Sequence, residues 1–352
     1  MKTIRNAVLI AILALLATPV TGPAGQRIAV TDLSAPGGPC CLAYGVNDNG
    51  QIVGTSATAE GPRAFMWEAG KGMTSLPALQ GDTESTAYAV NGRGQAVGVS
   101  GRRDRARAVL WNPSGEAIDL DAQAGGTRST AYAVNDRGQI AGFRTTPDGP
   151  RAILWDSAGA MTDLGVLSGG KSSKAYGINE NGQVVGFCAT PAGNRAFLWT
   201  PASGMTSLGV LPGGTDSTAY GINGRGQVVG VCHGPDGSRA FLWDRAAGMT
   251  DLGVLPGDTG SRALCVTDSG QVLGVSRNSE CNRAFLWDAA GGMRDINTLL
   301  GEACRDSARR IVEARAARTA KDGATLIAAR RAAGSCMVEC GRDGVSVSRL
   351  GQ

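Results

Sequence analysis

The chain contains a single histidine, His233, and this limits the acid–base chemistry that the sequence offers. The residue stands in the short segment His233-Gly-Pro-Asp236. There it could activate a nucleophile only beside a suitably placed serine and carboxylate. No Gly-x-Ser-x-Gly turn, which typically presents a serine nucleophile, occurs in the sequence. We therefore assign no catalytic residue, and an enzyme of the hydrolase or lyase class remains an alternative.

Six arginines form a second set of residues with chemical potential, because one occurs every 44 residues. They are Arg63, Arg107, Arg151, Arg195, Arg239 and Arg283. Guanidinium groups in register could form a cationic ring that binds an anionic ligand. Arginines that begin a strand can instead stack on aromatic residues and pair with nearby carboxylates. We favour this structural role, and the expected carboxylate partners are Asp119, Asp163, Asp251 and Asp295.

Residues 1–24 have the pattern of a secretory signal peptide. Lys2 and Arg5 precede an apolar run from Ala7 to Ala17, and small residues and prolines follow. The run is shorter than the roughly 20 residues that a membrane-spanning helix needs. We expect a secreted or periplasmic protein with no membrane span once the signal is removed.

Nine cysteines can pair in an exported protein, and their odd number leaves at least one thiol over. Cys336 and Cys340 form a C-x3-C pair, but no second pair of ligands accompanies them. We therefore expect no metal site. We predict at least one disulfide between the pair Cys40 and Cys41 and the pair Cys336 and Cys340. A second candidate disulfide joins Cys281 and Cys304, and Cys265 is the expected unpaired thiol.

The elements that must position these residues follow from a period of 44 residues. All six tryptophans obey it, as do six Gly-Gln pairs, the first at Gly50-Gln51. An asparagine precedes the first five of these pairs, whereas Thr267 replaces it in the sixth. The tryptophans are Trp67, Trp111, Trp155, Trp199, Trp243 and Trp287. A period of this size indicates stacked repeats of one supersecondary unit.

Each unit contains four short segments that suit β-strands. In one unit they are 175–178, 183–188, 195–199 and 205–208, each bounded by turn residues. Four antiparallel strands in 44 residues match one blade of a β-propeller. The third segment places apolar residues on both of its faces, which is typical of a sheet packed between two others. We predict an all-β propeller of four-stranded antiparallel blades.

The chain ends predict one further blade. The segment at 26–34 repeats the fourth-strand pattern, and 311–319, 324–330 and 345–350 read as the first three strands. A blade shared by both ends would remove the open edges of the array. We therefore predict seven blades in one domain at 26–352, with six repeats at about 42–305 and a degenerate closing blade from 306–352 and 26–34. The alternative is six blades plus a C-terminal extension, with a helix at 305–318.

The repeated unit resembles the HAF family of bacterial extracellular repeats. The resemblance is carried by Ala196-Phe-Leu-Trp199, Gly204-Met-Thr-Ser-Leu-Gly-Val-Leu211, Ala219-Tyr-Gly-Ile-Asn223 and Gly226-Gln-Val-Val-Gly230, and it covers nearly all of 27–300. The His-Ala-Phe that names the family is Arg-Ala-Phe or a variant here, so a role of that histidine does not carry over. The resemblance implies an exported, secreted or surface protein.

Regular repeats without insertions favour binding over catalysis, because no long loop is available to build a separate active site. We expect a scaffold that recognises a glycan or another exported protein; a purely structural or adhesive role is a further alternative. Without Lys2 and Arg5 of the predicted signal peptide, the net charge falls from +4 to +2. This charge is too small to attract nucleic acid strongly, so we expect no nucleic-acid partner. We also expect no cofactor and a monomeric protein. Candidate contact residues, taken from the hairpins that vary among the repeats, are Glu60, Arg103, Asp148, Asn194, Asp236 and Asn278.

Overall fold

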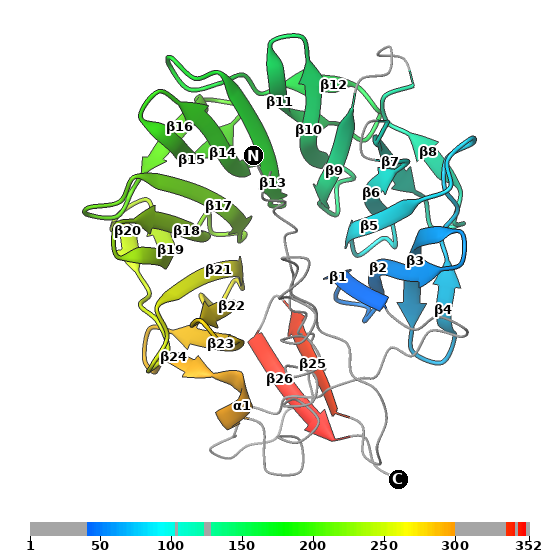
Figure 1. Ribbon diagram of the computed structural model, residues 1–352. Coiled ribbons are helices and arrows are strands. Elements are labelled where there is room, and N and C mark those ends of the chain that lie inside the picture. Colours follow the sequence, from blue (N-terminus) through cyan, green and yellow to red (C-terminus); the bar gives the residue numbers. More distant parts are fainter. Residues whose placement is uncertain (1–40, 103–104, 123–127, 300–335, 342–343, 350–352) are drawn as a thin grey trace.

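The computed structural model describes residues 41–102, 105–122, 128–299, 336–341 and 344–349. Strands β1 to β24 form six four-stranded antiparallel sheets, arranged around a common centre as propeller blades (Figure 1). The first strand of each blade is the innermost, and the innermost strands of successive blades contact one another. The predicted all-β propeller of four-stranded blades is therefore confirmed.

Blades 1 to 3 follow the chain in order. They consist of β1 (Cys41–Val46), β2 (Ile52–Thr58), β3 (Gly61–Glu68) and β4 (Gly72–Ser75); β5 (Ser85–Val90), β6 (Ala96–Ser100), β7 (Arg107–Trp111) and β8 (Ala117–Asp119); and β9 (Ser129–Val134), β10 (Ile140–Thr146), β11 (Gly149–Trp155) and β12 (Met161–Asp163).

Blades 4 to 6 continue the same order. They consist of β13 (Ser172–Ile178), β14 (Val184–Thr190), β15 (Gly193–Thr200) and β16 (Gly204–Gly209); β17 (Asp216–Ile222), β18 (Val228–Gly234), β19 (Gly237–Asp244) and β20 (Gly248–Asp251); and β21 (Gly260–Val266), β22 (Val272–Arg277), β23 (Asn282–Asp288) and β24 (Gly292–Asp295). A short helix, α1 (Ile296–Leu299), follows, and β25 (Cys336–Gly341) pairs with β26 (Gly344–Arg349).

The described residues form six blades, not the seven that we predicted, and the alternative of six blades fits. Strand β26 lies where we expected the third strand of a closing blade, but it pairs with β25 alone in a two-stranded sheet. The disulfide candidates Cys336 and Cys340 lie in β25. The other strands expected in the closing blade, at 26–34, 311–319 and 324–330, lie outside the described residues, as does the alternative helix at 305–318.

The core lies in the seams between blades, as the apolar pattern of the third strands predicts. In the seam between blades 4 and 5, Val185, Ala196 and Leu208 of one blade pack with Val228 and Phe241 of the next. Complete burial of a large apolar side chain contributes about 1.5–3 kcal/mol to stability. The tryptophans Trp111 and Trp155 are completely buried in the two blades where Val109 and Ile153 replace the phenylalanine. The periodic tryptophans are thus a part of these seams.

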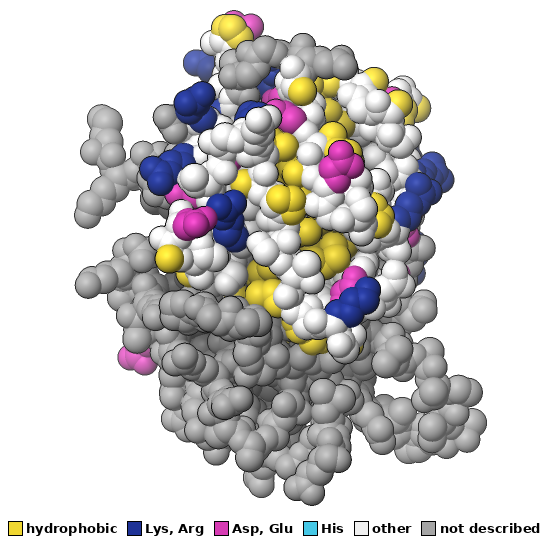
Figure 2. Space-filling view, turned by 90° about the vertical axis from the view of Figure 1, so that its right-hand side faces the viewer, with side chains coloured by type: hydrophobic (Ala, Val, Ile, Leu, Met, Phe, Trp, Pro, Cys, Tyr) yellow, Lys and Arg dark blue, Asp and Glu magenta, His cyan; other side chains and the backbone are white. Residues whose placement is uncertain are grey.

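The outer side of the ring carries charged residues around hydrophobic ones. Figure 2 shows this on the side that faces right in Figure 1, where Lys and Arg and Asp and Glu border the hydrophobic side chains. Within this outer layer, Ile118 of β8 is a large hydrophobic residue with 41% exposure. The fourth strands therefore form the solvent-facing layer of the blades.

The asparagine of each turn between the first two strands links neighbouring blades. The side-chain amide of Asn179 donates to the carbonyl of Asn223 in the next blade, at 2.9 Å. Its Oδ1 accepts from the backbone N–H groups of Asn181 and Gln183, at 3.1 and 3.0 Å. One buried side chain therefore closes its own turn and joins two blades. The equivalent residues Asn47, Asn91, Asn135 and Asn223 make the same links.

A serine near the start of each innermost strand from blade 2 onward accepts a backbone hydrogen bond from the preceding blade. Ser217 Oγ accepts from the N–H of Ala196 at 2.9 Å, and both residues are buried. A buried backbone N–H group without a hydrogen-bond partner destabilises the fold. The serine hydroxyl provides that partner, which an apolar side chain in its place would not. Ser85, Ser129, Ser173 and Ser261 accept in the same way.

Two buried cysteines take the same kind of structural place. Ser100 Oγ accepts from the N–H of Leu79 at 2.9 Å. At equivalent positions, Cys188 Sγ accepts from Leu167 and Cys232 Sγ from Leu211, both at 3.3 Å. Burial raises the pKa of both thiols, which keeps them protonated at neutral pH. These cysteines therefore act as seam residues.

We predict that Asn179→Ala lowers the free energy of unfolding by about 2 kcal/mol, because the buried carbonyl of Asn223 loses its partner. Urea denaturation followed by tryptophan fluorescence measures this loss. The matched control is Asn181→Ala, which removes an exposed link to the carbonyl of Gly224 in the same turn. We expect the control to change stability by less than about 0.5 kcal/mol. Equal losses in both variants would contradict the role of the buried link.

Candidate ligand-binding site

The two ends of the ring differ in chemistry. At one end, the turns between first and second strands repeat an Asn-x-x-Gly-Gln sequence, with Thr267 at the asparagine position of the sixth blade. At the other end lie the hairpins between second and third strands and the connections that enter the next blade. Their side chains differ from blade to blade, as in Thr58-Ala-Glu-Gly61 and His233-Gly-Pro-Asp236. We call the first end the uniform rim and the second the variable rim.

Five of the six predicted contact residues lie in described parts of the variable rim. Asp148 and Asp236 are exposed between the strands of their hairpins, and Glu60 is exposed and pairs with Arg63 at 3.1 Å. Asn194 and Asn278 are half-buried. Each of these five residues belongs to a different blade, so they share a rim and not one compact cluster. Arg103 lies outside the described residues.

The two half-buried asparagines hold the backbone of the rim. The N–H of Asn194 donates to Asp216 Oδ1 of the next blade at 2.8 Å. The side-chain amide of Asn278 donates to Asp258 Oδ1 at 3.1 Å, and its Oδ1 accepts from the N–H of Cys281 at 2.9 Å. The backbone N–H of Asn194 and the side chain of Asn278 are thus engaged within the protein, whereas Asp148 and Asp236 are exposed.

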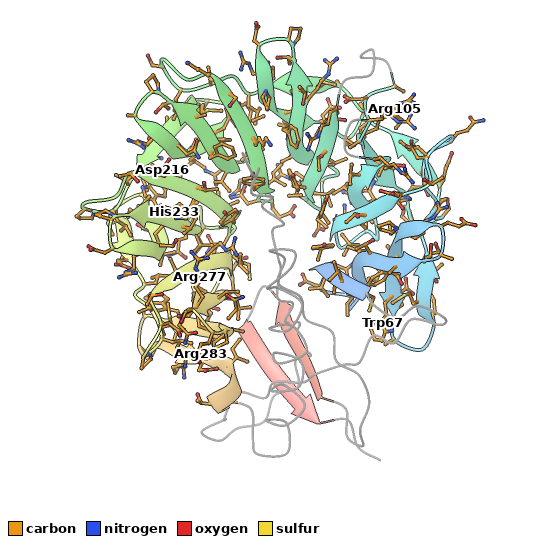
Figure 3. The ribbon with its side chains drawn as sticks, in the orientation of Figure 1. Trp67, Arg105, Asp216, His233, Arg277 and Arg283 are labelled. Atoms are coloured by element: carbon orange, nitrogen blue, oxygen red, sulfur yellow. The ribbon has the colours of Figure 1, made fainter. Side chains whose placement is uncertain are left out.

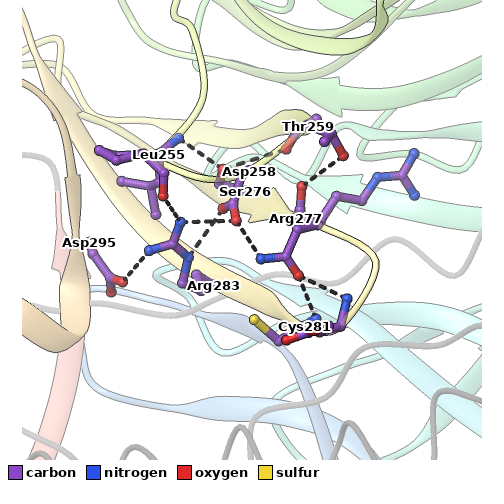
Figure 4. A network of polar contacts seen from close by, with 12 residues as sticks. Leu255, Asp258, Thr259, Ser276, Arg277, Cys281, Arg283 and Asp295 are labelled. Atoms are coloured by element: carbon purple, nitrogen blue, oxygen red, sulfur yellow. Dashed lines mark hydrogen bonds and ion pairs between the residues drawn. The ribbon is translucent and has the colours of Figure 1, made fainter.

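The periodic arginines brace the seams near this rim. Arg283 pairs with Asp258 at 2.9 Å and with Asp295 at 3.4 Å, and it donates to the carbonyl of Pro256 at 2.7 Å (Figure 4). The hydrogen bond to Asp258 raises the pKa of Arg283. Arg107 likewise pairs with two carboxylates. The contacts agree with the structural role predicted for these arginines.

The pairing with fourth-strand aspartates holds in only three of the blades. Asp119 pairs with Arg107 at 2.6 Å, Asp251 with Arg239 at 3.9 Å, and Asp295 with Arg283 at 3.4 Å. Arg151 and Arg195 instead donate to the carbonyls of Lys171 and Thr215, in the connections to the next blade, at 2.8 and 2.7 Å. Asp163 uses Oδ1 to accept from the N–H of Gly165.

The single histidine meets a serine but is not part of a triad. His233 Nδ1 lies 2.9 Å from Ser238 Oγ across their hairpin. Burial lowers the pKa of His233, so its imidazole is neutral at pH 7; the nearby charges of Asp216, which raises this pKa, and Arg277, which lowers it, act in opposite directions. Figure 3 shows Asp216 and His233 in one blade and Arg277 in the next.

The carboxylate that a triad would need is engaged elsewhere. Asp216 Oδ1 accepts from the N–H of Asn194, and Oδ2 accepts from the hydroxyl of Thr215 at 2.9 Å. Ser238 is 7% exposed and also lies 3.4 Å from a guanidinium nitrogen of Arg277. The structure therefore brings together a serine and a histidine with a cation beside them.

A ladder of five tyrosines lines the inner side of the ring, and the sequence analysis did not single it out. Each tyrosine is the extra residue of a β-bulge in an innermost strand. In β5, for example, Ala87 pairs with Gly98 and Ala89 pairs with Val97, so Tyr88 has no partner. Bulges re-aim side chains. The period of 44 was the available signal, because it contains every tyrosine of the chain: Tyr44, Tyr88, Tyr132, Tyr176 and Tyr220.

Successive rings of this tyrosine ladder contact one another. The centroid distances are 5.4, 5.2, 5.1 and 5.6 Å from Tyr44 to Tyr220, in edge-on or tilted arrangements. Such pairs contribute about 0.5–1.5 kcal/mol beyond their buried area. Two second-strand phenylalanines, Phe143 and Phe187, stack on Tyr132 and Tyr176. The innermost surface is thus aromatic over five consecutive blades.

Burial raises the pKa of the hydroxyl groups of the first four tyrosines of the ladder. It raises the pKa of Tyr44 and that of Tyr132 to about 12, and it also raises the pKa of Tyr88 and Tyr176. A protonated phenol can donate a hydrogen bond to a ligand. The ladder therefore combines an apolar body with donors.

Two cations lie over the aromatic rings of this inner surface. Lys174 Nζ is 4.2 Å from the centre of Phe143, and the guanidinium carbon of Arg262 is 5.9 Å from the centre of Tyr220. Burial lowers the pKa of Lys174, and the charge of Arg128 lowers it further. Cations are attracted to aromatic faces, and such contacts also occur in sites that bind ligands.

The predicted disulfides involve residues on both sides of the described ranges. Cys40 and Cys304 lie outside them, and so does the side-chain environment of Cys336 and Cys340. Cys41 is buried in β1, and Cys281 is half-buried in the last hairpin of the ring. The proposed Cys281–Cys304 and Cys40/Cys41 to Cys336/Cys340 disulfides therefore stay predictions.

Within 41–299 and the C-terminal hairpin, apart from the gaps, no group of three or more His, Cys, Asp or Glu residues is placed to hold a metal ion. Among the helices that the structure describes, none has the length and apolar character to cross a membrane.

Known proteins resemble this chain in fold. The sequence matches no protein-family model and no curated protein. A streptogramin B lyase structure superimposes with a TM-score of 0.53 and 10% identity, covering 92% of this chain and 94% of that one. A catalytically inactive virginiamycin B lyase from Staphylococcus aureus with quinupristin gives 0.53 and 10%, over 92% and 96%.

A third similar structure is TolB from Acinetobacter baumannii, with a TM-score of 0.50 and 12% identity over 70% of this chain. This chain spans 62% of the length of that protein. At such low identities the likeness establishes the β-propeller fold alone.

We predict that the protein loses stability between pH 10 and pH 12 because of the tyrosine ladder. Tyr44 has a pKa of about 12 when folded and 10.0 ordinarily, so the folded state binds more protons in this range. Its contribution is present below pH 10 and disappears as the pH approaches 12. Urea denaturation at several pH values measures this loss. Between pH 10 and pH 12 the unfolding free energy of Tyr44→Phe should fall by about 1–3 kcal/mol less than that of the unchanged protein. Parallel curves for both proteins would contradict the prediction.

Proposed function

We propose that this protein is an exported recognition scaffold that binds a glycan or another exported protein on its variable rim. The observation that carries the proposal is the difference between the two rims. The asparagines of the uniform rim repeat the same internal hydrogen bonds in blade after blade. The variable rim presents exposed groups of different chemistry, such as Glu60, Asp148 and Asp236. Binding residues are concentrated on loops that a rigid scaffold positions.

Export is a part of this proposal. It rests on the signal-peptide pattern of residues 1–24, which lie outside the described residues. The resemblance of the repeated unit to the HAF family supports the same localisation, because that family suggests exported bacterial proteins. Detection of the mature protein in the periplasm or culture medium, with residues 1–24 removed, tests this part of the proposal.

A second candidate function is an enzyme of the hydrolase or lyase class with its active site on the variable rim. The contact of His233 Nδ1 with Ser238 Oγ at 2.9 Å favours it, since a neutral histidine can accept a proton from a hydroxyl. Turnover of a screened substrate that is lost in both Ser238→Ala and His233→Gln would establish this function in place of simple binding.

For the recognition function, we predict that the double variant Asp148→Ala and Asp236→Ala weakens ligand binding by at least about fivefold, because both carboxylates are exposed at hairpin tips. The ligand is first found with a glycan array and a pull-down of exported proteins, and affinity is then measured by calorimetry. Asp156→Ala is the control, because Asp156 is an exposed carboxylate in the turn after β11, at the end of the blade opposite the hairpins. An equal loss in the control would contradict recognition by the variable rim.

A further inference from the structure

Three cations of the innermost strands and their connections have no carboxylate partner among the described residues. Arg128, Lys174 and Arg262 are in none of the ion pairs, whereas the periodic Arg107 and Arg283 each pair with two carboxylates. The contacts of Lys174 and Arg262 are instead with the aromatic rings of Phe143 and Tyr220. Both side chains are half-buried, and Arg128 is exposed. Positive charge is therefore left uncompensated beside the tyrosine ladder.

The two half-buried cations bracket one part of this ladder. Lys174 lies over Phe143, which stacks on Tyr132 at 6.0 Å. Arg262 lies over Tyr220. Tyr176 stands between the two, at 5.1 Å from Tyr132 and 5.6 Å from Tyr220. The result is an arc of three tyrosines with a cation at each end.

Like charges also gather at one end of the arc. The positive charge of Arg128 lowers the pKa of Lys174 and that of Tyr132, so its field reaches both groups. Two neighbouring cations repel each other, and a bound anion relieves that repulsion. An anion placed here could accept charge-assisted hydrogen bonds from lysine and arginine, which are stronger than neutral ones.

We propose that the arc formed by Tyr132, Tyr176 and Tyr220, with Lys174 and Arg262 at its ends, binds an acidic glycan through its carboxylate groups. This inference rests on the proposed recognition function and adds to it a second surface, on the innermost strands β13, β17 and β21 and their neighbour β9, apart from the hairpins that carry Asp148 and Asp236. The carboxylates pair with the two cations, and the apolar faces of the sugar rings pack on the aromatic rings. Ligand sites combine such apolar walls with a few placed polar groups.

The backbone beside the arc disfavours an acidic peptide as the ligand. An extended peptide binds to a sheet by adding a strand to a regular edge. A bulge interrupts the pairing of the innermost strand in each of the three blades that supply the tyrosines, at Tyr132, Tyr176 and Tyr220. Bulges are among the features that stop edge pairing. Recognition by side chains, as a glycan requires, therefore fits this surface better.

The test uses the purified full-length protein and a short oligogalacturonate, whose sugar units carry carboxylates. Calorimetry compares it with the methyl-esterified oligomer, which is neutral, and with a polyglutamate peptide. We expect saturable binding of the acid form. Its affinity should fall by about tenfold in the Lys174→Gln variant and by about tenfold in the Arg262→Gln variant. Added salt should weaken it further. Urea denaturation checks that both variants remain folded.

Matched controls are Lys71→Gln and Arg93→Gln, which neutralise exposed cations far from the arc in sequence and on other turns. They should bind the acid oligomer as the unchanged protein does. Equal binding of the neutral ester, equal losses in the controls, or binding of polyglutamate alone would overturn the acidic-glycan site. If another ligand binds and depends on Asp148 and Asp236 but not on Lys174, the proposed recognition function stands and this inference fails. If no glycan or exported protein binds at all, the proposed function fails as well.

Discussion

The structure depends on how each blade satisfies the buried backbone groups of its neighbour. Six similar sheets can stack only if the N–H and carbonyl groups in their seams find partners, because unpaired buried groups are costly. Asn179 and its equivalents supply donors to a carbonyl of the next blade, and Ser217 and its equivalents accept an N–H of the preceding one. Both links span blades, so the period of 44 is a condition for the ring and not only a trace of duplication.

Much of the fold could be predicted because its signal is periodic. The predicted strand segment 195–199 lies within β15, and the segment 183–188 begins one residue before β14. The apolar third strand packs in the seam as its pattern indicates. The number of blades was predicted wrongly, because the chain ends lack the repeat. A fourth-strand pattern at 26–34 and strand-like segments near the C-terminus indicated a closing blade, but neither feature specifies a pairing partner. In the structure β26 pairs with β25 in a local hairpin.

The site was less accessible from sequence, because its residues are defined by register and neighbours. The tyrosines share the period, but a bulge that unpairs Tyr88 depends on how β5 pairs with β6. The sequence indicated no role for Cys188 and Cys232, whereas their position equivalent to Ser100 identifies them as seam acceptors. Likewise, His233 contacts Ser238 because the tight hairpin between β18 and β19 pairs the two residues.

The seam contacts also explain why the asparagine recurs in the turns between first and second strands while the hairpins between second and third strands vary. Substitution of the asparagines on the uniform rim would remove several hydrogen bonds at once, and the arginines near the variable rim hold seam carboxylates such as Asp258. The hairpin tips at Asp148 and Asp236 make no comparable demand, since their side chains are exposed. Lys174 is different from both groups, because it is half-buried and its pKa is lowered, yet it contacts an aromatic ring instead of a carboxylate. Its cation–π contact contributes about 0.5–2 kcal/mol, but it leaves the positive charge without a carboxylate among the described residues, and this charge is what the proposed acidic ligand would neutralise.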